Sequence, residues 1–224
     1  MVIIPLVMGK KVLIDLMILD FDGTLTDSIP PAVEAIQKML RELNLPFKTK
    51  EEINQHVGYG EVPLVSGAIG SKDPKLIKTA MEVYFKHYVQ EGIEKVPLYP
   101  HVREFLEYFK NKLKIIVSNK KDEFIRKILE FHNLTSYFAE ILGGDTAPTL
   151  KPDPSAIKNI LKKYQVPPER TLFIGDMTVD IETGKNAKVY TCAVTYGFHD
   201  RNKLQKLHPD FLVDDLLELK ELIE

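Results

Sequence analysis

The chain of 224 residues is long enough for one large domain, or for a core domain with a smaller second domain. Its net charge of −2 gives no sign of a surface for nucleic acid or for an anionic membrane, so neither partner is expected. The single cysteine excludes an internal disulfide and a zinc site built on several thiolates, and it fits a cytoplasmic protein. These numbers leave the oligomeric state open.

The N-terminal stretch from Val2 to Val7 is apolar but too short to cross a membrane. The basic pair Lys10 and Lys11 follows it, whereas a signal peptide carries its positive charge first. A start at Met8 instead of Met1 would also make sense, and it would leave the first residues as a disordered or strand-extending tail.

The first predicted element is an apolar strand over residues 12–20, ending at Asp20. Only helices are expected in the next part of the chain, and Tyr84, Phe85 and Tyr88 are expected in the core of that helical part. Strands and helices then alternate. The predicted helices cover residues 29–43, 50–57, 63–68, 74–90, 101–111, 122–131, 153–164, 181–187 and 215–223, and the later strands cover 114–117, 138–142, 171–174, 189–194 and 210–213.

This alternation predicts an α/β fold with a doubly wound parallel sheet and helices on both faces. Between Asp22 and Lys114, however, lie about 90 residues, far more than the dozen that a crossover between neighbouring parallel strands needs. The excess predicts an inserted helical cap over residues 26–96, on a core domain made of residues 1–25 and 97–224. The two connections, near Thr26 and Val96, would form a hinge.

Polar residues follow several of the predicted strands. Ligands of parallel α/β folds bind at the carboxyl ends of the strands, so these residues are candidates for a site. They are Asp20, Ser118, Asp145 and Asp176. Asp20 and Asp22 point the same way if the strand continues, and two adjacent carboxylates repel unless a cation or a proton separates them. The pair therefore indicates a metal ion and an anionic substrate.

Four separated motifs resemble those of the haloacid dehalogenase superfamily, in the order that the family has them. They are DFDGTLTDS at residues 20–28, the strand that ends in Ser118 and Asn119, Lys151 in TLKPDP, and Gly175-Asp176 with Asp180 in GDMTVD. The similarity covers nearly the whole chain.

The resemblance implies a role for each motif residue. Asp20 would be the nucleophile that forms an aspartyl-phosphate, and Asp22 the general acid and then the base. Mg²⁺ would be bound by the Asp20 side chain, the Asp22 backbone carbonyl and Asp176. Lys151 would supply positive charge to the nucleophile and the phosphate, and Ser118 and Asn119 would bind the phosphate. Asp180 would not contact the metal or the phosphate itself but would orient Lys151 or a water molecule bound to the metal.

Structural explanations compete with several of these roles. Asp22 before Gly23 could simply form a turn, and Ser118 could cap the following helix. Lys151 could be a solvated loop residue, and Asp180 could cap the short helix after it. Two further residues stay outside the predicted site: Asp145, which could shape a loop, and Cys192, which is expected in the core.

Dehalogenases of this superfamily lack the second aspartate, so Asp22 favours phosphatase or phosphomutase chemistry. Gly58, Tyr59 and Gly60 in the cap, and IETGKNA at residues 181–187, are similar to phosphoglycolate phosphatases. A helix–helix turn that needs glycine explains the cap stretch equally well. The leading substrate is 2-phosphoglycolate, one of the small phosphorylated metabolites that the cap would admit. A sugar-phosphate phosphatase, a pyrophosphatase, a β-phosphoglucomutase-like phosphomutase and a non-enzymatic scaffold or regulator remain alternatives.

Overall fold

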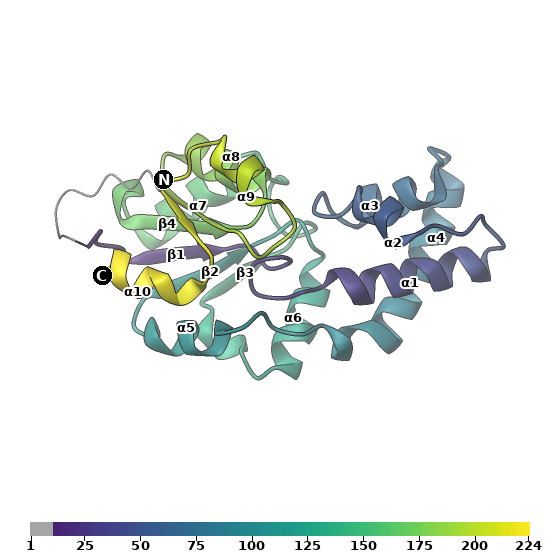
Figure 1. Cartoon of the computed structure of the whole chain (residues 1–224), viewed down its shortest axis with the longest axis horizontal. Coiled ribbons are helices and arrows are strands. Elements are labelled where there is room, and N and C mark those ends of the chain that lie inside the picture. The colour runs from purple at the N-terminus through teal and green to yellow at the C-terminus, as the bar shows by residue number, and fades with distance from the viewer. Residues whose placement is uncertain (1–10) are drawn as a thin grey trace.

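The computed structural model describes residues 11–224, so the question of Met1 or Met8 as the start lies outside the described residues. Within residues 11–224, six parallel strands form one sheet in the order β3-β2-β1-β4-β5-β6 (Figure 1). The strands are β1 (Leu16–Leu19), β2 (Leu113–Val117), β3 (Glu140–Leu142), β4 (Thr171–Gly175), β5 (Tyr190–Val194) and β6 (Phe211–Val213).

Helices cover both faces of this sheet, so both faces are buried. Alternate residues of a strand point to opposite faces and therefore belong to different core clusters. In β1, Leu16 and Ile18 share a core cluster with Ile157 of α7 (Ser155–Tyr164) and Ala187 of α8 (Thr178–Ala187). Met17 and Leu19 belong to the cluster on the opposite side, which includes side chains of α5 (Val102–Tyr108) and α6 (Asp122–Phe131). The predicted doubly wound α/β fold is confirmed.

A group of helices lies beside the sheet, beyond its carboxyl-terminal edge (Figure 1). Within the group α1 packs against α2 and α4, and α3 packs against α4. Its members are α1 (Ile29–Glu42), α2 (Lys50–Asn54), α3 (Glu61–Ile69), α4 (Pro74–His87), the π-helical turn η1 (Tyr88–Gly92) and the 3₁₀ turn η2 (Ile93–Lys95). Two chain segments connect it to the sheet, joined by a bridge between Thr26 and Leu98 and by a hydrogen bond from the Asp27 N–H to the Pro97 carbonyl. The limits of the cap remain a prediction.

The first strand is shorter than predicted. It begins at Leu16, since the residues before it pair with the end of the chain: the Val12 N–H donates to the Leu222 carbonyl and the Ile14 N–H to that of Glu224. Local pattern could not reveal that partner, which lies about two hundred residues away.

Several predicted helices have different ends. The helix predicted over residues 74–90 leaves α-geometry after His87, and the one predicted from residue 181 begins at Thr178. The last predicted helix is two short pieces, η5 (Leu216–Glu218) and α10 (Leu219–Leu222). The prediction missed α9 (Arg201–Gln205) and the 3₁₀ turns η3 (Thr135–Tyr137) and η4 (Pro168–Arg170). The early start of α8 matters most, because it places Asp180 in the first helical turn.

Three aromatic residues near the end of α4, Tyr84, Phe85 and Tyr88, lie where the helical group meets the sheet domain. Tyr84 and Tyr88 are buried, and the rings of Phe85 and Tyr88 lie 5.2 Å and 5.0 Å from that of Phe124 in α6. They therefore join the two parts instead of filling only the cap. Cys192 is buried in β5, as predicted. No helix within residues 11–224 combines the length and the apolar character that a membrane span requires.

Candidate active site

Three neighbouring strands deliver the predicted site residues to one edge of the sheet. Asp20 follows β1, Ser118 and Asn119 follow β2, and Asp176 follows β4; β1 lies between the other two strands. Because the strands are parallel, their carboxyl ends meet at one edge. Residues almost 160 positions apart in the sequence therefore lie together.

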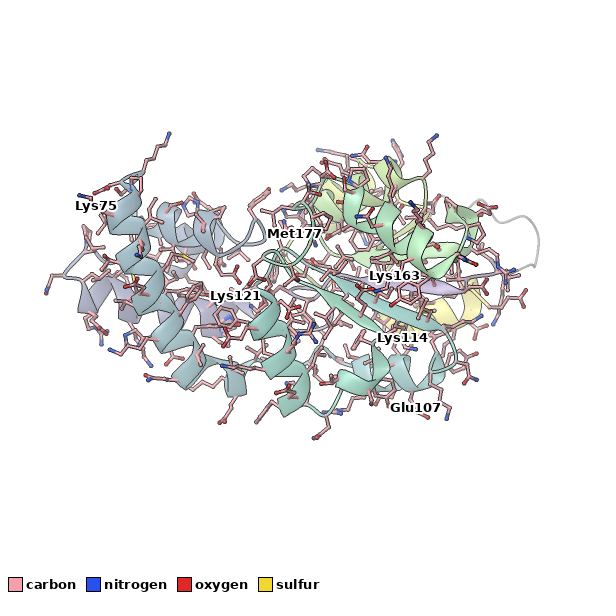
Figure 2. The ribbon with its side chains drawn as sticks, turned by 180° about the vertical axis from the view of Figure 1, so that it is seen from behind. Lys75, Glu107, Lys114, Lys121, Lys163 and Met177 are labelled. Atoms are coloured by element: carbon pink, nitrogen blue, oxygen red, sulfur yellow. The ribbon has the colours of Figure 1, made fainter. Side chains whose placement is uncertain are left out.

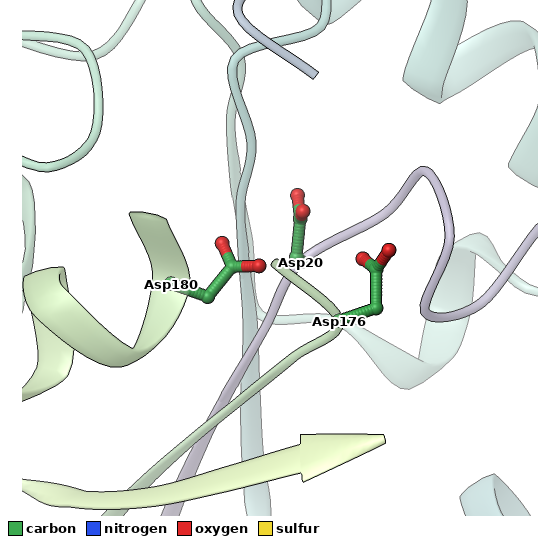
Figure 3. Close-up of side chains that lie close together, drawn as sticks. All are labelled: Asp20, Asp176 and Asp180. Carbon is green, nitrogen blue, oxygen red and sulfur yellow. The ribbon is translucent and has the colours of Figure 1, made fainter. Parts of the chain in front are cut away.

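Asp20, Asp176 and Asp180 form a buried acidic cluster (Figure 3). One carboxylate oxygen of each lies within 4.8 Å of the others. Burial, together with the charges of Asp180 and Asp20, raises the pKa of Asp176 well above its usual value. Burial also raises the pKa of Asp180, to about 6, although the Lys151 ammonium opposes this rise. Crowded carboxylates with raised pKa values favour a proton or a cation between them.

The surroundings of Asp176 fit a metal site. The Thr24 hydroxyl donates to its Oδ1 at 3.1 Å and the Phe198 N–H to its Oδ2 at 2.7 Å, so both oxygens are oriented. A Cβ added at Gly23 or Gly197 would lie only 2.2 Å or 2.3 Å from Asp176 atoms, which leaves these positions to glycine. A donor set made of oxygens suits a hard divalent cation, so the cluster could hold such an ion.

Lys151 lies between two carboxylates of the cluster. Its Nζ is 2.8 Å from Asp20 Oδ2 and 2.6 Å from Asp180 Oδ1. Burial alone would lower the pKa of this ammonium, but the charges of Asp180 and Asp20 outweigh burial and raise it. Lys151 is therefore a buried lysine whose charged form is favoured by its neighbours, and its interpretation as a solvated loop lysine is wrong.

Asp180 makes both of the contacts that were considered for it. Its Oδ1 accepts from Lys151, while its Oδ2 accepts from the Met177 N–H at 2.9 Å, as a residue in the first turn of α8 can. Helix capping and the orientation of Lys151 are thus compatible.

Ser118 does not cap α6, whose N-cap residue is Lys121; its Oγ accepts from the Lys120 N–H at 3.4 Å. The Asn119 side chain joins three segments. Its Oδ1 accepts from the Lys151 N–H at 2.9 Å, and its Nδ2 donates to the Gly58 carbonyl at 3.3 Å. The loop that carries Lys151 is thereby tied to the helical group.

The carboxylate of Asp22 lies apart from the acidic cluster, and the Lys120 Nζ donates to its Oδ2 at 3.2 Å. Lys120 was not among the site residues predicted from the sequence. Its position after the Ser118-Asn119 pair was a signal, but an identical residue follows it, and the sequence cannot tell a buried lysine from an exposed one. Asp22 thus does more than form a turn.

Thr24 and Glu61 were also not among the predicted site residues. The Thr24 hydroxyl orients Asp176, as described above. Glu61 begins α3, and its Oε1 accepts from the Lys121 N–H at 2.8 Å. Lys121 and Met177 mark the junction between the helical group and the sheet domain in Figure 2.

A cavity lies at this junction. From the sheet side it is lined by Asp20, Asp22, Ser118, Asn119, Lys120 and Lys151, and from the helical side by Ser28, Ile29, Ala32, Val57, Gly58, Gly60, Glu61, Leu64 and Tyr84. Of the three cap residues singled out in the sequence, the two glycines face the cavity, whereas the Tyr59 side chain is exposed. Gly58 and Gly60 have φ angles of 93° and 97°, as the turn interpretation requires.

Comparison with known proteins identifies the family. Residues 17–194 match the model of the haloacid dehalogenase-like hydrolases. The chain is 32% identical to the phosphoglycolate phosphatase of Vibrio cholerae, over 94% of this chain and 97% of that protein. It is 33% identical to the phosphoglycolate phosphatase of Pseudomonas savastanoi pv. phaseolicola, over 91% of this chain and 78% of that protein.

A solved structure shares the fold. A predicted phosphoglycolate phosphatase from Haemophilus somnus superposes with a TM-score of 0.87 at 26% identity, covering 93% of this chain and 97% of that one. Sequence and structure agree along nearly the whole chain, and the protein belongs to the haloacid dehalogenase-like hydrolase family.

Proposed function

We propose that this protein is a Mg²⁺-dependent phosphatase that cleaves a small phosphate monoester through an aspartyl-phosphate. The observation that supports this most is the buried Asp20 carboxylate, 2.8 Å from the Lys151 ammonium and in the cavity that Asp22 also lines. A nucleophile, a fixed positive charge and a second carboxylate are the groups that this reaction needs.

In the first step an Asp20 oxygen attacks phosphorus, the bond to the ester oxygen breaks, and Asp22 gives its proton to the leaving alcohol. In the second step Asp22 takes a proton from water, whose oxygen attacks the aspartyl-phosphate and releases phosphate and Asp20. Lys151 offsets the negative charge on the phosphoryl group in both steps, with Ser118 and Asn119 binding its oxygens.

A metal ion would be held by Asp20, Asp176 and the backbone carbonyl of Asp22. When bound, Mg²⁺ would neutralise charge on the phosphate and on the clustered carboxylates. Asp180 would keep Lys151 in place.

The leading substrate is 2-phosphoglycolate. This choice is supported by relatives that carry the name phosphoglycolate phosphatase and by the small cavity under the helical group. Sugar phosphates, pyrophosphate and isomerisation by a phosphomutase are the competing possibilities, and a screen of these compounds decides among them. The single cysteine supports our expectation of a cytoplasmic location.

The function is tested with Asp20→Asn, which has nearly the same shape but lacks the nucleophilic charge. We expect p-nitrophenyl phosphate and 2-phosphoglycolate hydrolysis to fall at least about 1,000-fold, with an unchanged circular dichroism spectrum. Asp145→Asn is the matched control, since Asp145 also follows a strand but only accepts a hydrogen bond from the Asp122 N–H. Activity retained by Asp20→Asn would remove Asp20 as the nucleophile.

A further inference from the structure

Lys120 is a buried cation in the wall of the active-site cavity. Its side chain is only 5% exposed, and it lines the cavity together with Asp20 and Asp22. Its Nζ lies 3.2 Å from Asp22 Oδ2 and 4.8 Å from the centre of the Tyr88 ring. The mechanism proposed above does not use this residue.

The ammonium of Lys120 is paired inside the cavity wall. The Asp22 carboxylate and the face of the Tyr88 ring are the negative groups that it contacts. A buried ammonium is unfavourable unless anions pair with it, and such a group in a cleft is a candidate for a functional role. Lys121, the next residue, shows the contrast: its side chain is 30% exposed and pairs with Glu123.

The position of Lys120 relative to the substrate follows from the proposed function, on which this inference rests. Asp22 contacts the leaving oxygen of the ester, and Lys120 contacts Asp22. The ammonium is therefore one contact beyond that oxygen, close to whatever group the adjacent carbon of the leaving alcohol carries. A carboxylate at that place would complete a charge-assisted hydrogen bond.

Much of the remaining cap wall is apolar. Ile29, Val57 and Leu64 line it, and they offer no partner to the hydroxyl groups of a sugar. Glu61 places a carboxyl group on this cap wall, and burial raises the pKa of that group although the Lys120 charge opposes the rise. Glu61 thus favours its neutral form more than an exposed glutamate does, which reduces its repulsion of an incoming anion.

We propose that Lys120 determines specificity by binding the carboxylate of the substrate, so that the site prefers phosphate esters of small 2-hydroxy acids to uncharged esters of the same size. The Lys120 ammonium replaces the water molecules that bind such a carboxylate in solution. An uncharged ester has no negative group to pair with the ammonium.

The test compares 2-phosphoglycolate with 2-phosphoglycolamide, which has the same shape but no carboxylate charge. We expect the wild-type protein to prefer the acid in kcat/KM on the order of 100-fold. Lys120→Met should bring the ratio of the two kcat/KM values close to one. Because each ratio is taken within one variant, general damage from the lost Asp22 contact affects both substrates and cancels.

Lys121→Met is the matched control, because it removes an ammonium from the next residue, at the junction outside the cavity (Figure 2). It should keep the wild-type ratio. A Lys120→Met protein that also keeps this ratio overturns the proposal. So does a wild-type protein without the preference, and that result does not depend on whether the variant folds.

Binding separates this proposal from the proposed hydrolysis. If the wild-type protein cleaves no phosphate ester, the phosphatase assignment fails, and calorimetric titration of the Mg²⁺-loaded protein with the two compounds still decides the role of Lys120. Tighter binding of the acid, lost in Lys120→Met and kept in Lys121→Met, supports the proposal. Equal affinities for the acid and the amide overturn it.

Discussion

At the scale of single residues, Asp176 and Asp180 lower the stability of the folded chain when they ionise, because both are buried. Both side chains are buried, and their folded-state pKa values lie above the ordinary value of 3.8, with that of Asp180 at about 6. For an acid with a raised pKa, the folded chain binds more protons than the unfolded chain between the two pKa values, so the free energy of unfolding falls as pH rises through that interval. For Asp180 the interval runs from about pH 4 to about pH 6. Above it, the ionised Asp180 carboxylate stays buried beside Asp20 and Asp176, and a cation should relieve the repulsion within the cluster.

We therefore expect Mg²⁺ to stabilise the protein more at pH 8 than at pH 5, where protons compete for the same oxygens. At a concentration a hundred times Kd, binding contributes about 2.7 kcal/mol, a rise in Tm of roughly 5–10 °C for a chain of this size. Thermal unfolding at both pH values, with Mg²⁺ or with EDTA, measures the difference.

Asp176→Asn should lose most of the rise in Tm, whereas Asp145→Asn should keep it. The same rise at both pH values, or none with Mg²⁺, would argue against a metal site in this cluster.

Among the elements, the loop between α2 and α3 lies close to segments of the sheet domain that carry site residues. Gly58 has a φ of 93°, and a Cβ there would lie 2.2 Å from Met177 Sδ, next to Asp176. The Gly58 carbonyl also accepts a hydrogen bond from Asn119 Nδ2, and Asn119 Oδ1 accepts one from the Lys151 N–H. One residue of this loop therefore contacts two segments that carry site residues.

Gly58→Ala should raise KM several-fold, because the new methyl group must displace the buried Met177 side chain. Strain from the positive φ adds about 1 kcal/mol of destabilisation. Gly70→Ala is the matched control: Gly70 ends α3 with a φ of 64°, and nothing lies within 4 Å of the position of its Cβ.

Both variants should lower Tm through strain at the positive φ, and Gly58→Ala should lower it further because Met177 must move. Only Gly58→Ala should change KM for 2-phosphoglycolate. Equal KM values in the two variants would show that the close approach of Gly58 to Met177 has no effect on the site.

The whole molecule consists of a sheet domain and a helical group that share one cavity. Two adjacent segments connect them near Thr26 and Leu98, and across the cavity they are joined by hydrogen bonds such as the one from the Lys121 N–H to Glu61. We propose that residues 26–96 move as a cap about these two segments, which would let substrate enter and then exclude water.

Orthovanadate is an analogue of the phosphoryl group during its transfer. Binding of Mg²⁺ with orthovanadate should favour the arrangement in which the cap is closed over the cavity. We expect slower hydrogen exchange at the amide of Lys121, because opening would break the hydrogen bond that this amide donates to Glu61. Helix α7 lies on the far face of the sheet and provides the control, with unchanged exchange. An exchange rate at the Lys121 amide that is the same with and without the ligand would contradict a moving cap.

The sequence by itself determined the parallel α/β fold and the strand ends at which Asp20, Ser118 and Asp176 lie. These features depend on local pattern: apolar runs of strand length, helices between them and polar residues directly after the runs. The family was indicated by the resemblance of four motifs to those of a known superfamily. Even there, the element ends were less accurate, as the shortened β1 and the early start of α8 show.

Only the tertiary structure decided which polar residues meet. Lys120 and Lys121 are identical neighbours, yet one is buried against Asp22, 98 positions away, and the other is partly exposed. Thr24 contacts Asp176 across 152 positions, and Glu61 meets the backbone of Lys121 across 60. Burial and pairing of charges depend on segments that approach one another only after folding, and hydrophobic periodicity along the chain does not contain that information.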